Sequence, residues 1–449
     1  VATAQPVTTN SYFREKALSS YFSRLNYDFR GKYYFSASFR RDGSSIFGKD
    51  NKWGNFWSVA GSWRLSQEDF MAGLTWVDDL KLRASYGING SDAVRVYERY
   101  IAMALFDYGE NYGGNAGIAL SQMANPDLKW EKLTAWDIAT EFRVFNRLSG
   151  TIEFYNKKSD GLLYDQKLSF TTGVPTVKTN IAEIVNKGIE VQLSSDNVRR
   201  NDFSWTTDLN FASNKNEITS LPEDKVLDGS KIWEEGGDRY QFYIQKFAGV
   251  DSQDGAPMWY VEDEDTKEIT TTKKYAEATR FRSGSALPDW TAGLTNNFTY
   301  KGFDLSFMFY FSVGGKVLDY TEADLMHMGA SPGTQLITDV IDGAWQKPGD
   351  ETDIPRFEVN NNFQFSERST RFLHDNSYIR LRNITLGYNV PSQYLKRVRL
   401  SNLRLFVQAD NMWTWQEHKG LDPEQSVAGT SNNNMPNVKT FSFGVKLGL

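Results

Sequence analysis

Apolar and polar side chains alternate over the last nine positions of the chain. From Phe441 to Leu449 every second residue is apolar, and the residues between are serine, glycine or lysine. Because successive side chains of a strand point to opposite faces, this segment predicts a strand with one apolar and one polar face. A strand of a membrane β-barrel has this pattern, with its apolar face toward lipid.

The same alternation recurs upstream. Its clearest copy runs from Phe303 to Phe311, with five apolar side chains on one face. The segment from Leu80 to Ile88 places Lys81 and Arg83 on its polar face, and two cations there argue against the dry core of a sandwich. Three further segments with the pattern are Ile189 to Leu193, Phe203 to Phe211 and Leu403 to Ala409.

Two positions break the alternation. Phe406 falls on the polar face of its predicted strand. At Asn383 the phase slips, because Ile379 and Leu381 are followed by Ile384 rather than by an apolar residue at 383. An extra residue in one strand produces such a slip, so we predict a β-bulge at this point.

Connections of two lengths separate the predicted strands. Short ones fall at residues 31–32, 66–77, 146–147, 198–202, 301–302 and 391–400. Long ones fall at residues 41–52, 91–128, 161–182, 217–288, 314–375 and 416–437. Outer-membrane barrels have short periplasmic turns and longer extracellular loops. We therefore assign the short connections to the periplasmic side and the long ones to the extracellular side.

About 13 strands result from this count, and the last ends on the periplasmic side. An odd number cannot close a bacterial barrel, whereas the large plugged transporters have about 22 strands. We therefore expect an all-β transmembrane barrel of which residues 1–449 form the C-terminal portion, with roughly nine strands before Val1. Val1 and the residues after it lack a signal peptide, which agrees with a piece of a longer or nicked protein.

Composition narrows the class of protein further. Aromatic residues make up 14% of the chain, which suits the aromatic girdles of a membrane barrel. The mean hydropathy of -0.52 fits strands of which half the residues face water. No run approaches the roughly 18 apolar residues of a spanning helix. The absence of cysteine excludes disulfides and thiolate sites. The net charge of -6 does not indicate the basic surface that binds nucleic acid.

Several segments together resemble the SusC-like branch of TonB-dependent outer-membrane transporters. Among them are Arg-Asp-Gly-Ser-Ser-Ile-Phe-Gly at 41–48, Asn-Pro-Asp-Leu-Lys-Trp-Glu at 125–131 and Tyr-Ile-Arg-Leu-Arg-Asn-Ile-Thr-Leu-Gly-Tyr at 378–388. Shorter matches lie at residues 53–54, 62–66, 186–190, 249–251, 287–290, 300–304 and 420–424. The resemblance covers nearly the whole chain, and it departs at Leu449, where an aromatic residue is common.

The resemblance implies a transporter with a plug inside a 22-stranded barrel. It also implies a TonB-contacting segment upstream, and both that segment and the plug lie outside this chain. Its partners are then a SusD-like surface lipoprotein that lids the outer opening, the TonB–ExbB–ExbD complex and outer-membrane lipids. Such proteins import oligosaccharides or peptides, and the family allows a dimer of transporter–lipoprotein pairs.

No catalytic, metal or cofactor site is predicted. His327, His374 and His418 lie in long loops without a metal-ligand spacing, and we expect them to be solvated. The glycine-rich residues 112–117 have no following helix and predict a loop tip rather than a phosphate site. Residues 262–265 read as a solvated acidic loop, and residues 251–255 as an Asx turn with glycine at positive φ.

Loop aromatics are the candidate ligand contacts. Trp233, Tyr240, Trp259 and Tyr260 fall in the loop at 217–288, where they can stack on sugar faces or on peptide side chains. The alternative is that these four rings pack the loop against itself. Whether the cargo is a glycan or a peptide stays open, because aromatic rings serve both.

Inward-facing arginines are the candidate plug contacts. By the alternation Arg380, Arg382 and Arg404 project into the barrel, where a buried charge needs a partner, and we expect plug carboxylates to supply it. Trp413 and Trp415 at the outer end of the penultimate strand fit the aromatic girdle without any ligand.

Three alternatives compete with this prediction, and the first of them, an importer of iron chelates, belongs to the same class. An importer of iron chelates shares the barrel, and so does a passive porin, which lacks a plug. A soluble β-propeller or sandwich with glycan-active chemistry would have strands of about five or six residues. The strands predicted here are about twice as long, close to the roughly 9 to 11 residues of a membrane crossing.

Overall fold

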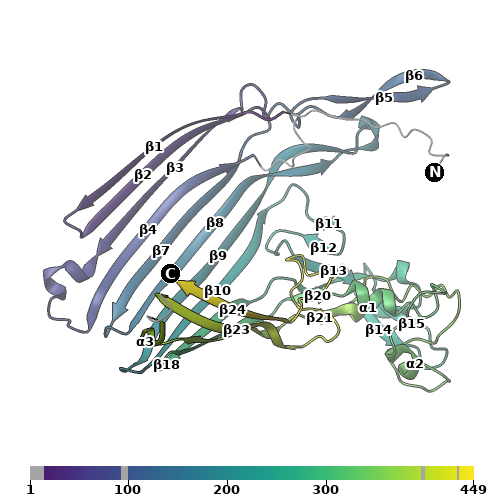
Figure 1. Ribbon diagram of the computed structural model, residues 1–449. Helices are drawn as coiled ribbons and strands as arrows, with labels where there is room; N and C mark the ends of the chain where they lie inside the picture. Colours follow the sequence, from purple (N-terminus) through teal and green to yellow (C-terminus); the bar gives the residue numbers. More distant parts are fainter. Residues whose placement is uncertain (1–14, 93–99, 396–399, 432–433, 449) are drawn as a thin grey trace, which may run out of the picture.

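The computed structural model describes residues 15–92, 100–395, 400–431 and 434–448. The expectations for Val1 and Leu449 concern residues outside these ranges. Thirteen long strands form one antiparallel sheet, in the same order as in the chain, so it is built from successive hairpins (Figure 1). The strands are β1 (Leu18–Phe29), β2 (Tyr33–Ser44), β3 (Trp53–Arg64), β4 (Val77–Ser91), β7 (Glu131–Val144), β8 (Leu148–Lys167), β9 (Thr176–Arg199), β10 (Phe203–Ser220), β18 (Trp290–Tyr300), β19 (Phe303–Val313), β22 (Tyr378–Asn389), β23 (Asn402–Gln416) and β24 (Thr440–Gly448).

The sheet curves as part of a barrel and does not close (Figure 1). Strands β1 and β24 are its two edges, and each pairs with a single strand among the described residues. This confirms the expected all-β barrel and the number of strands counted from the sequence. Two unpaired edges are what a piece of a larger barrel must have, because only closure removes them.

Tight turns join the strands at one end of the sheet, as predicted. Between β18 and β19 the two turn residues, Lys301 and Gly302, have φ angles of 45° and 90°. Positive φ at both positions gives a turn whose twist matches that of the flanking strands, and it favours glycine. The turns after β1 and β7 also hold residues at positive φ, including Gly31 and Asn146.

Long connections lie at the opposite end, with one correction. The expected loop at residues 161–182 is mostly strand, because β8 runs on to Lys167 and β9 begins at Thr176. The pairing shifts between Ser159 and Leu163, around Gly161 at a φ of 65°. An alternation search misses strands that continue beyond such an irregularity, since the phase of the pattern changes there.

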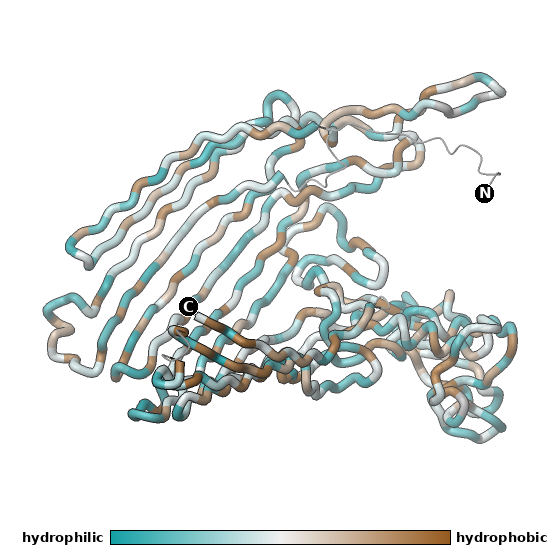
Figure 2. Tube along the Cα trace, viewed as in Figure 1, coloured by the Kyte–Doolittle hydropathy of each residue, from teal (hydrophilic) through white to brown (hydrophobic). Residues whose placement is uncertain are grey.

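The pairing of residues across neighbouring strands confirms that the strands have one apolar and one polar face. Figure 2 shows hydrophobic and hydrophilic residues alternating along the strands, and the pairing aligns apolar residues with apolar ones across neighbouring strands. Phe303, Tyr388, Leu405 and Val445 form one apolar row, and Leu305, Leu386, Val407 and Phe443 form the next. Phe443 is 81% exposed in the isolated chain, which suits a side chain that meets lipid.

The predicted β-bulge is present beside Asn383. In the pairing of β19 with β22, Met308 lies opposite Asn383 and Phe309 opposite Leu381, so Arg382 is the extra residue. The bulge lets Leu381 and Ile384 both face outward although three positions separate them.

Smaller elements lie in the connections between the long strands, most of them in the outer loops. They are the hairpin β5 (Leu105–Tyr112) and β6 (Asn115–Gln122), a sheet of β11 (Val226–Asp228), β12 (Lys231–Trp233), β13 (Gln241–Gln245) and β17 (Arg280–Ser285), a sheet of β14 (Phe247–Val250), β15 (Pro257–Glu262) and β16 (Ile269–Thr272), and the pair β20 (Lys316–Leu318) and β21 (Leu373–Asp375). The helices are α1 (Tyr320–Leu325), α2 (Asp339–Gly343), α3 (Ser392–Leu395), and the 3-10 turns η1 (Leu65–Gln67), η2 (Asp69–Met71), η3 (Phe170–Thr172), η4 (Tyr275–Glu277) and η5 (Thr370–Phe372). None of these described helices is both long and apolar enough to cross a membrane.

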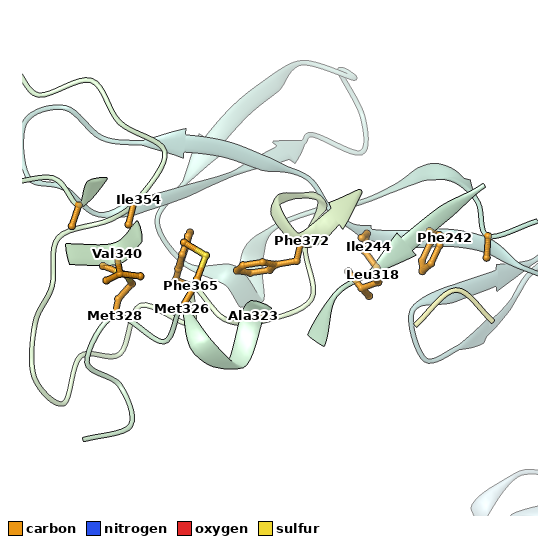
Figure 3. Packing of buried hydrophobic residues seen from close by; sticks show 12 residues of the cluster. Phe242, Ile244, Leu318, Ala323, Met326, Met328, Val340, Ile354, Phe365 and Phe372 are labelled. Atoms are coloured by element: carbon orange, nitrogen blue, oxygen red, sulfur yellow. The ribbon is translucent and has the colours of Figure 1, made fainter. Parts of the chain in front are cut away.

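A hydrophobic core holds two of the outer loops together. Figure 3 shows Phe242 and Ile244 of β13 in line with Phe372, Met326 and Phe365 from the loop between β19 and β22. Phe242 and Phe372 are fully buried. These loops therefore form a packed unit rather than separate solvated segments.

Three loop motifs behave as the sequence predicts. Asp251 accepts the backbone N–H of Gln253, and Gly255 has a φ of 70°, which is an Asx turn followed by a left-handed residue. In the acidic segment Asp263 accepts N–H groups from its own exposed loop. Residues 113–114 form the turn of the β5–β6 hairpin.

Candidate ligand-binding site

The inner face of the sheet is a wall of paired charges. Lys81 Nζ lies 3.3 Å from a carboxylate oxygen of Glu141, and Arg83 contacts both Glu141 and Glu153. The cross-strand register of β4, β7 and β8 places these side chains on one face. They line a cleft of about 670 Å³ along the wall of the first strands. Such a surface holds water or a polar partner, because unpaired burial of these charges would be costly.

A second charged cluster lies under the outer rim. Arg380, 3% exposed, donates to Asp422 at 2.8 Å, and its other terminal nitrogen lies 3.1 Å from Glu424 without hydrogen-bond geometry. Arg382 donates to Glu424 at 2.9 Å. Burial opposes ionisation of Asp422, but the backbone N–H of Glu424 and the Arg380 guanidinium outweigh it, so the pKa of Asp422 is lowered. Two of the segments that carry the family resemblance, residues 378–388 and 420–424, therefore contact each other here.

The third predicted wall arginine is paired as well. Arg404 on β23 makes a two-pronged contact with Asp304 on β19, with Nε donating at 3.0 Å. Asn389 donates to the same carboxylate at 2.9 Å. All three arginines thus have carboxylate partners within this chain, where the sequence analysis expected partners on a plug. Their contact with a plug stays a prediction.

The four predicted ligand aromatics do not form one site. Trp259 is 0% exposed, and its indole N–H has no hydrogen-bond partner among the described residues. It packs edge-on against Phe247 and has no surface for a cargo in this structure. Tyr240 packs against the loop core, and Tyr260 lies under Lys246 at 5.2 Å. For these side chains the structure supports the self-packing alternative.

Trp233, by contrast, lines a pocket. This pocket of about 360 Å³ lies where the outer ends of β7 to β10 meet β12. The Trp233 ring is 6.1 Å from that of Tyr164, and the Arg239 guanidinium lies 5.1 Å over the indole. The Trp233 N–H is buried and has no hydrogen-bond partner within the described ranges, so the indole offers its ring face to the pocket.

Charges of both signs border this pocket. Lys178 Nζ lies 2.8 Å from Asp165, and Glu131 accepts the backbone N–H of Leu163 at 2.6 Å. Apolar side chains, among them Ile218 and Leu163, make up much of the remaining lining. A cavity with two aromatic rings and a few polar groups has the character of a small-ligand site.

Sequence reasoning missed most of this pocket. Tyr164, Asp165 and Lys178 belong to the segment expected to be a loop, and the continued strands bring them to the rim. The β-branched run Thr176-Val177 was the one local signal for strand there. Arg239 could not be found, because its approach to Trp233 depends on how a long loop folds back.

The expectation of solvated histidines is wrong. His327 is 5% exposed, and its ring nitrogens contact the N–H of Gly329 and the hydroxyl of Thr334. His374 and His418 stack on each other with ring centroids 3.7 Å apart. Periodicity gives no warning of this burial, since the loops pack through scattered residues.

Comparisons with known proteins agree with this architecture. The family model for the β-barrel of TonB dependent receptor-like proteins matches residues 2–412. TonB-dependent receptor P3 of Formosa agariphila is 32% identical over 99% of this chain and 46% of its own length. TonB-dependent receptor SusC of Bacteroides thetaiotaomicron is 29% identical over 97% of this chain and 44% of its own length. The chain spans about half the length of these curated relatives.

A solved relative matches the whole fold. The RagAB peptide transporter structure aligns with 96% of this chain and 48% of its own chain, with a TM-score of 0.83 and 28% sequence identity. The open-open state of the RagAB peptide importer gives the same TM-score over 97% of this chain.

Proposed function

The chain belongs to the TonB dependent receptor-like β-barrel family of the outer membrane, and from this premise we propose how the whole protein works. It imports oligosaccharides or peptides across the outer membrane. The TonB–ExbB–ExbD complex supplies the energy, and a SusD-like lipoprotein covers the outer opening. The family consists of transporters and receptors, so no enzymatic activity is assigned.

The observation that carries this proposal is the open half-barrel itself. Thirteen strands end in two unpaired edges, carry a charged inner wall and bear long packed loops at one end. This arrangement needs further strands to close it and polar contents to cover the wall. Similarity to the RagAB transporter along 96% of the chain supports the same use of the scaffold.

The wall acts through its charges. In the proposal, cargo binds between the lid and the plug, and a pull on the plug opens a path along the wall. Arg380, Arg382 and Arg404 remain the proposed plug-facing residues, and their in-chain carboxylates hold the guanidinium groups in fixed positions. Cargo favours the closed state only as far as it binds that state more tightly.

Peptides are the first cargo to test. The Trp233 pocket offers Arg239 and the Lys178–Asp165 pair beside two aromatic rings. A peptide presents charged, amide and apolar groups close together, which suits this mixture. The RagAB structures are named as a peptide importer.

Gentle purification from the native outer membrane tests the proposed assembly. Mass spectrometry of what stays bound should find the plug-bearing part of the protein, a surface lipoprotein and a peptide or oligosaccharide. The mass of the native particle also decides whether two transporter–lipoprotein pairs associate. Recovery of this barrel without any lipoprotein partner would contradict the lid.

A further inference from the structure

We propose that Glu322, His374 and His418 bind a divalent transition-metal ion of the Zn²⁺ class, which fastens two outer loops together. One ligand atom from each side chain lies within 4.8 Å of the others. Glu322 is on α1, His374 on β21, and His418 follows β23. The three ligands thus come from separate segments that meet only in the folded loops.

The two imidazole rings present the same nitrogen to neighbouring carboxylates. His374 Nε2 lies 2.5 Å from Glu322, and His418 Nε2 lies 2.9 Å from Asp319. The rings are parallel within 2°, with centroids 3.7 Å apart. Since an ionised carboxylate only accepts, each neutral ring carries its proton on Nε2 here. A metal ion between His374 Nε2 and Glu322 would replace the proton of His374, which passes to solvent. His418 would bind the ion through Nδ1 and keep its Nε2–H on Asp319.

The donor set has the chemistry of a transition-metal site. Two imidazoles and one carboxylate are ligands that Zn²⁺ takes in proteins, with one coordination position left open. At bond lengths of about 2.0 to 2.2 Å the ligand atoms must come closer than 4.8 Å, so the rings have to turn out of their stack. The side chains are partly buried, at 12% to 23% exposure, which leaves both an entry path and room to turn.

Asp319 supplies an orienting contact around the site. It is 3% exposed and also accepts from the Ser431 hydroxyl at 3.0 Å and from the backbone N–H of Glu322 at 3.1 Å. A carboxylate held by several donors cannot swing away, so it fixes the ring of His418. Carboxylates in this position commonly orient histidine ligands of metals.

One cation opposes metal binding. Arg371 lies 3.7 Å from Glu322, but its other terminal nitrogen is 3.2 Å from Asp353. The acidic groups around the rings therefore outnumber this guanidinium among the described residues. The competing interpretation is a latch of two histidine–carboxylate hydrogen bonds that binds no metal.

Titration of the whole purified protein in detergent with Zn²⁺ alone distinguishes the two. We expect saturable binding that weakens at least about tenfold in His374→Asn, His418→Asn and Glu322→Gln, and about 10- to 100-fold in Asp319→Asn. The matched control is His327→Asn, a buried histidine outside the cluster, which should bind Zn²⁺ as the native protein does. Heat-modified migration on gels checks that each variant keeps a folded barrel.

A second readout follows the loops themselves. Added Zn²⁺ should slow amide exchange in residues 316–325 and 417–431 of the native protein, and a chelator should reverse this. In the double variant His374→Asn/His418→Asn the ion should have no effect on these segments. Absence of saturable binding, or binding that persists in the double variant, would overturn the site.

Discussion

At the residue scale, glycine on a neighbouring strand explains how the ring of Phe406 fits on the polar face of its strand. Phe406 lies between Gly387 and Gly444 on the neighbouring strands. A methyl group at Gly444 would approach the ring to 2.1 Å. Gly444 thus provides the space for the ring of Phe406, whereas a methyl group at Gly387 would meet the Arg404–Asp304 pair. The pattern of a single strand cannot reveal this space.

Gly444→Ala tests this close approach. We expect a loss of about 1 to 3 kcal/mol in the free energy of unfolding, because the ring of Phe406 must leave its position. Urea unfolding in detergent measures it. Gly73→Ala is the control, since nothing lies within 4 Å of a methyl group there. Equal stability of the two variants would show that the ring moves without cost.

Trp233→Ala tests the rim pocket. Loss of the indole removes a stacking surface, so cargo affinity should fall about tenfold, or about 1.4 kcal/mol. Binding of the co-purified cargo by calorimetry provides the measurement. Phe170→Ala, at a ring 98% exposed on a loop tip, should leave affinity unchanged. The same affinity in both variants would remove the pocket from the cargo path.

Lys231 gives the loops a pH dependence. It is 7% exposed, and burial lowers its pKa from 10.5 to about 7. Between pH 7 and 10.5 the unfolded state binds more protons, so the loop unit gains stability as pH rises through this window. Below pH 7 the full cost of the buried charge is present.

In the Lys231→Met variant the stability of the loop unit should therefore not increase between pH 7 and 10.5. Amide exchange of β11 to β13 at pH 6.5, 8 and 9.5 measures the effect, with Lys225→Met at an exposed position as the control. We expect Lys231→Met to stabilise the loop unit most at pH 6.5, and this stabilisation relative to the native protein should become smaller as the pH increases. A gain that does not change with pH would contradict a buried, titrating lysine.

At the element scale, the strands could be predicted and the loops could not. Alternation and tight-turn residues are local, so Lys301-Gly302 and the run from Phe303 to Phe311 fix their own structure. The loop core joins Phe242 to Phe372 across 130 positions, and no local pattern records that contact. The continuation of β8 past Gly161 was missed for a different reason, since the pairing shift there changes the phase of the alternation.

Arg380 links two such elements, and Arg380→Met measures the link. The change leaves Asp422 without its buried partner, while Glu424 keeps Arg382, and the loop after β23 should lose about 3 to 5 kcal/mol of stability. Faster amide exchange in residues 417–431 would report it. Lys274→Met, which removes an exposed pair with Glu277, should change stability by less than about 1 kcal/mol. Unchanged exchange after Arg380→Met would show that the loop is held by other contacts.

At the scale of the whole molecule, the chain forms one open wall of a barrel. Its outer face is apolar for lipid, its inner face carries charges, and its loops gather at one end. A passive porin and an active importer share these properties. The difference between them is energy, since only the importer depends on TonB.

Uptake of the co-purified cargo by living cells tests the central claim most directly. Labelled cargo should accumulate in the parent strain, and accumulation should fall to background when the gene is deleted, when TonB is removed or when the proton-motive force is collapsed. The gene deletion separates this protein from other routes. Uptake that requires the gene but continues without TonB and without proton-motive force would contradict active import and identify a passive channel.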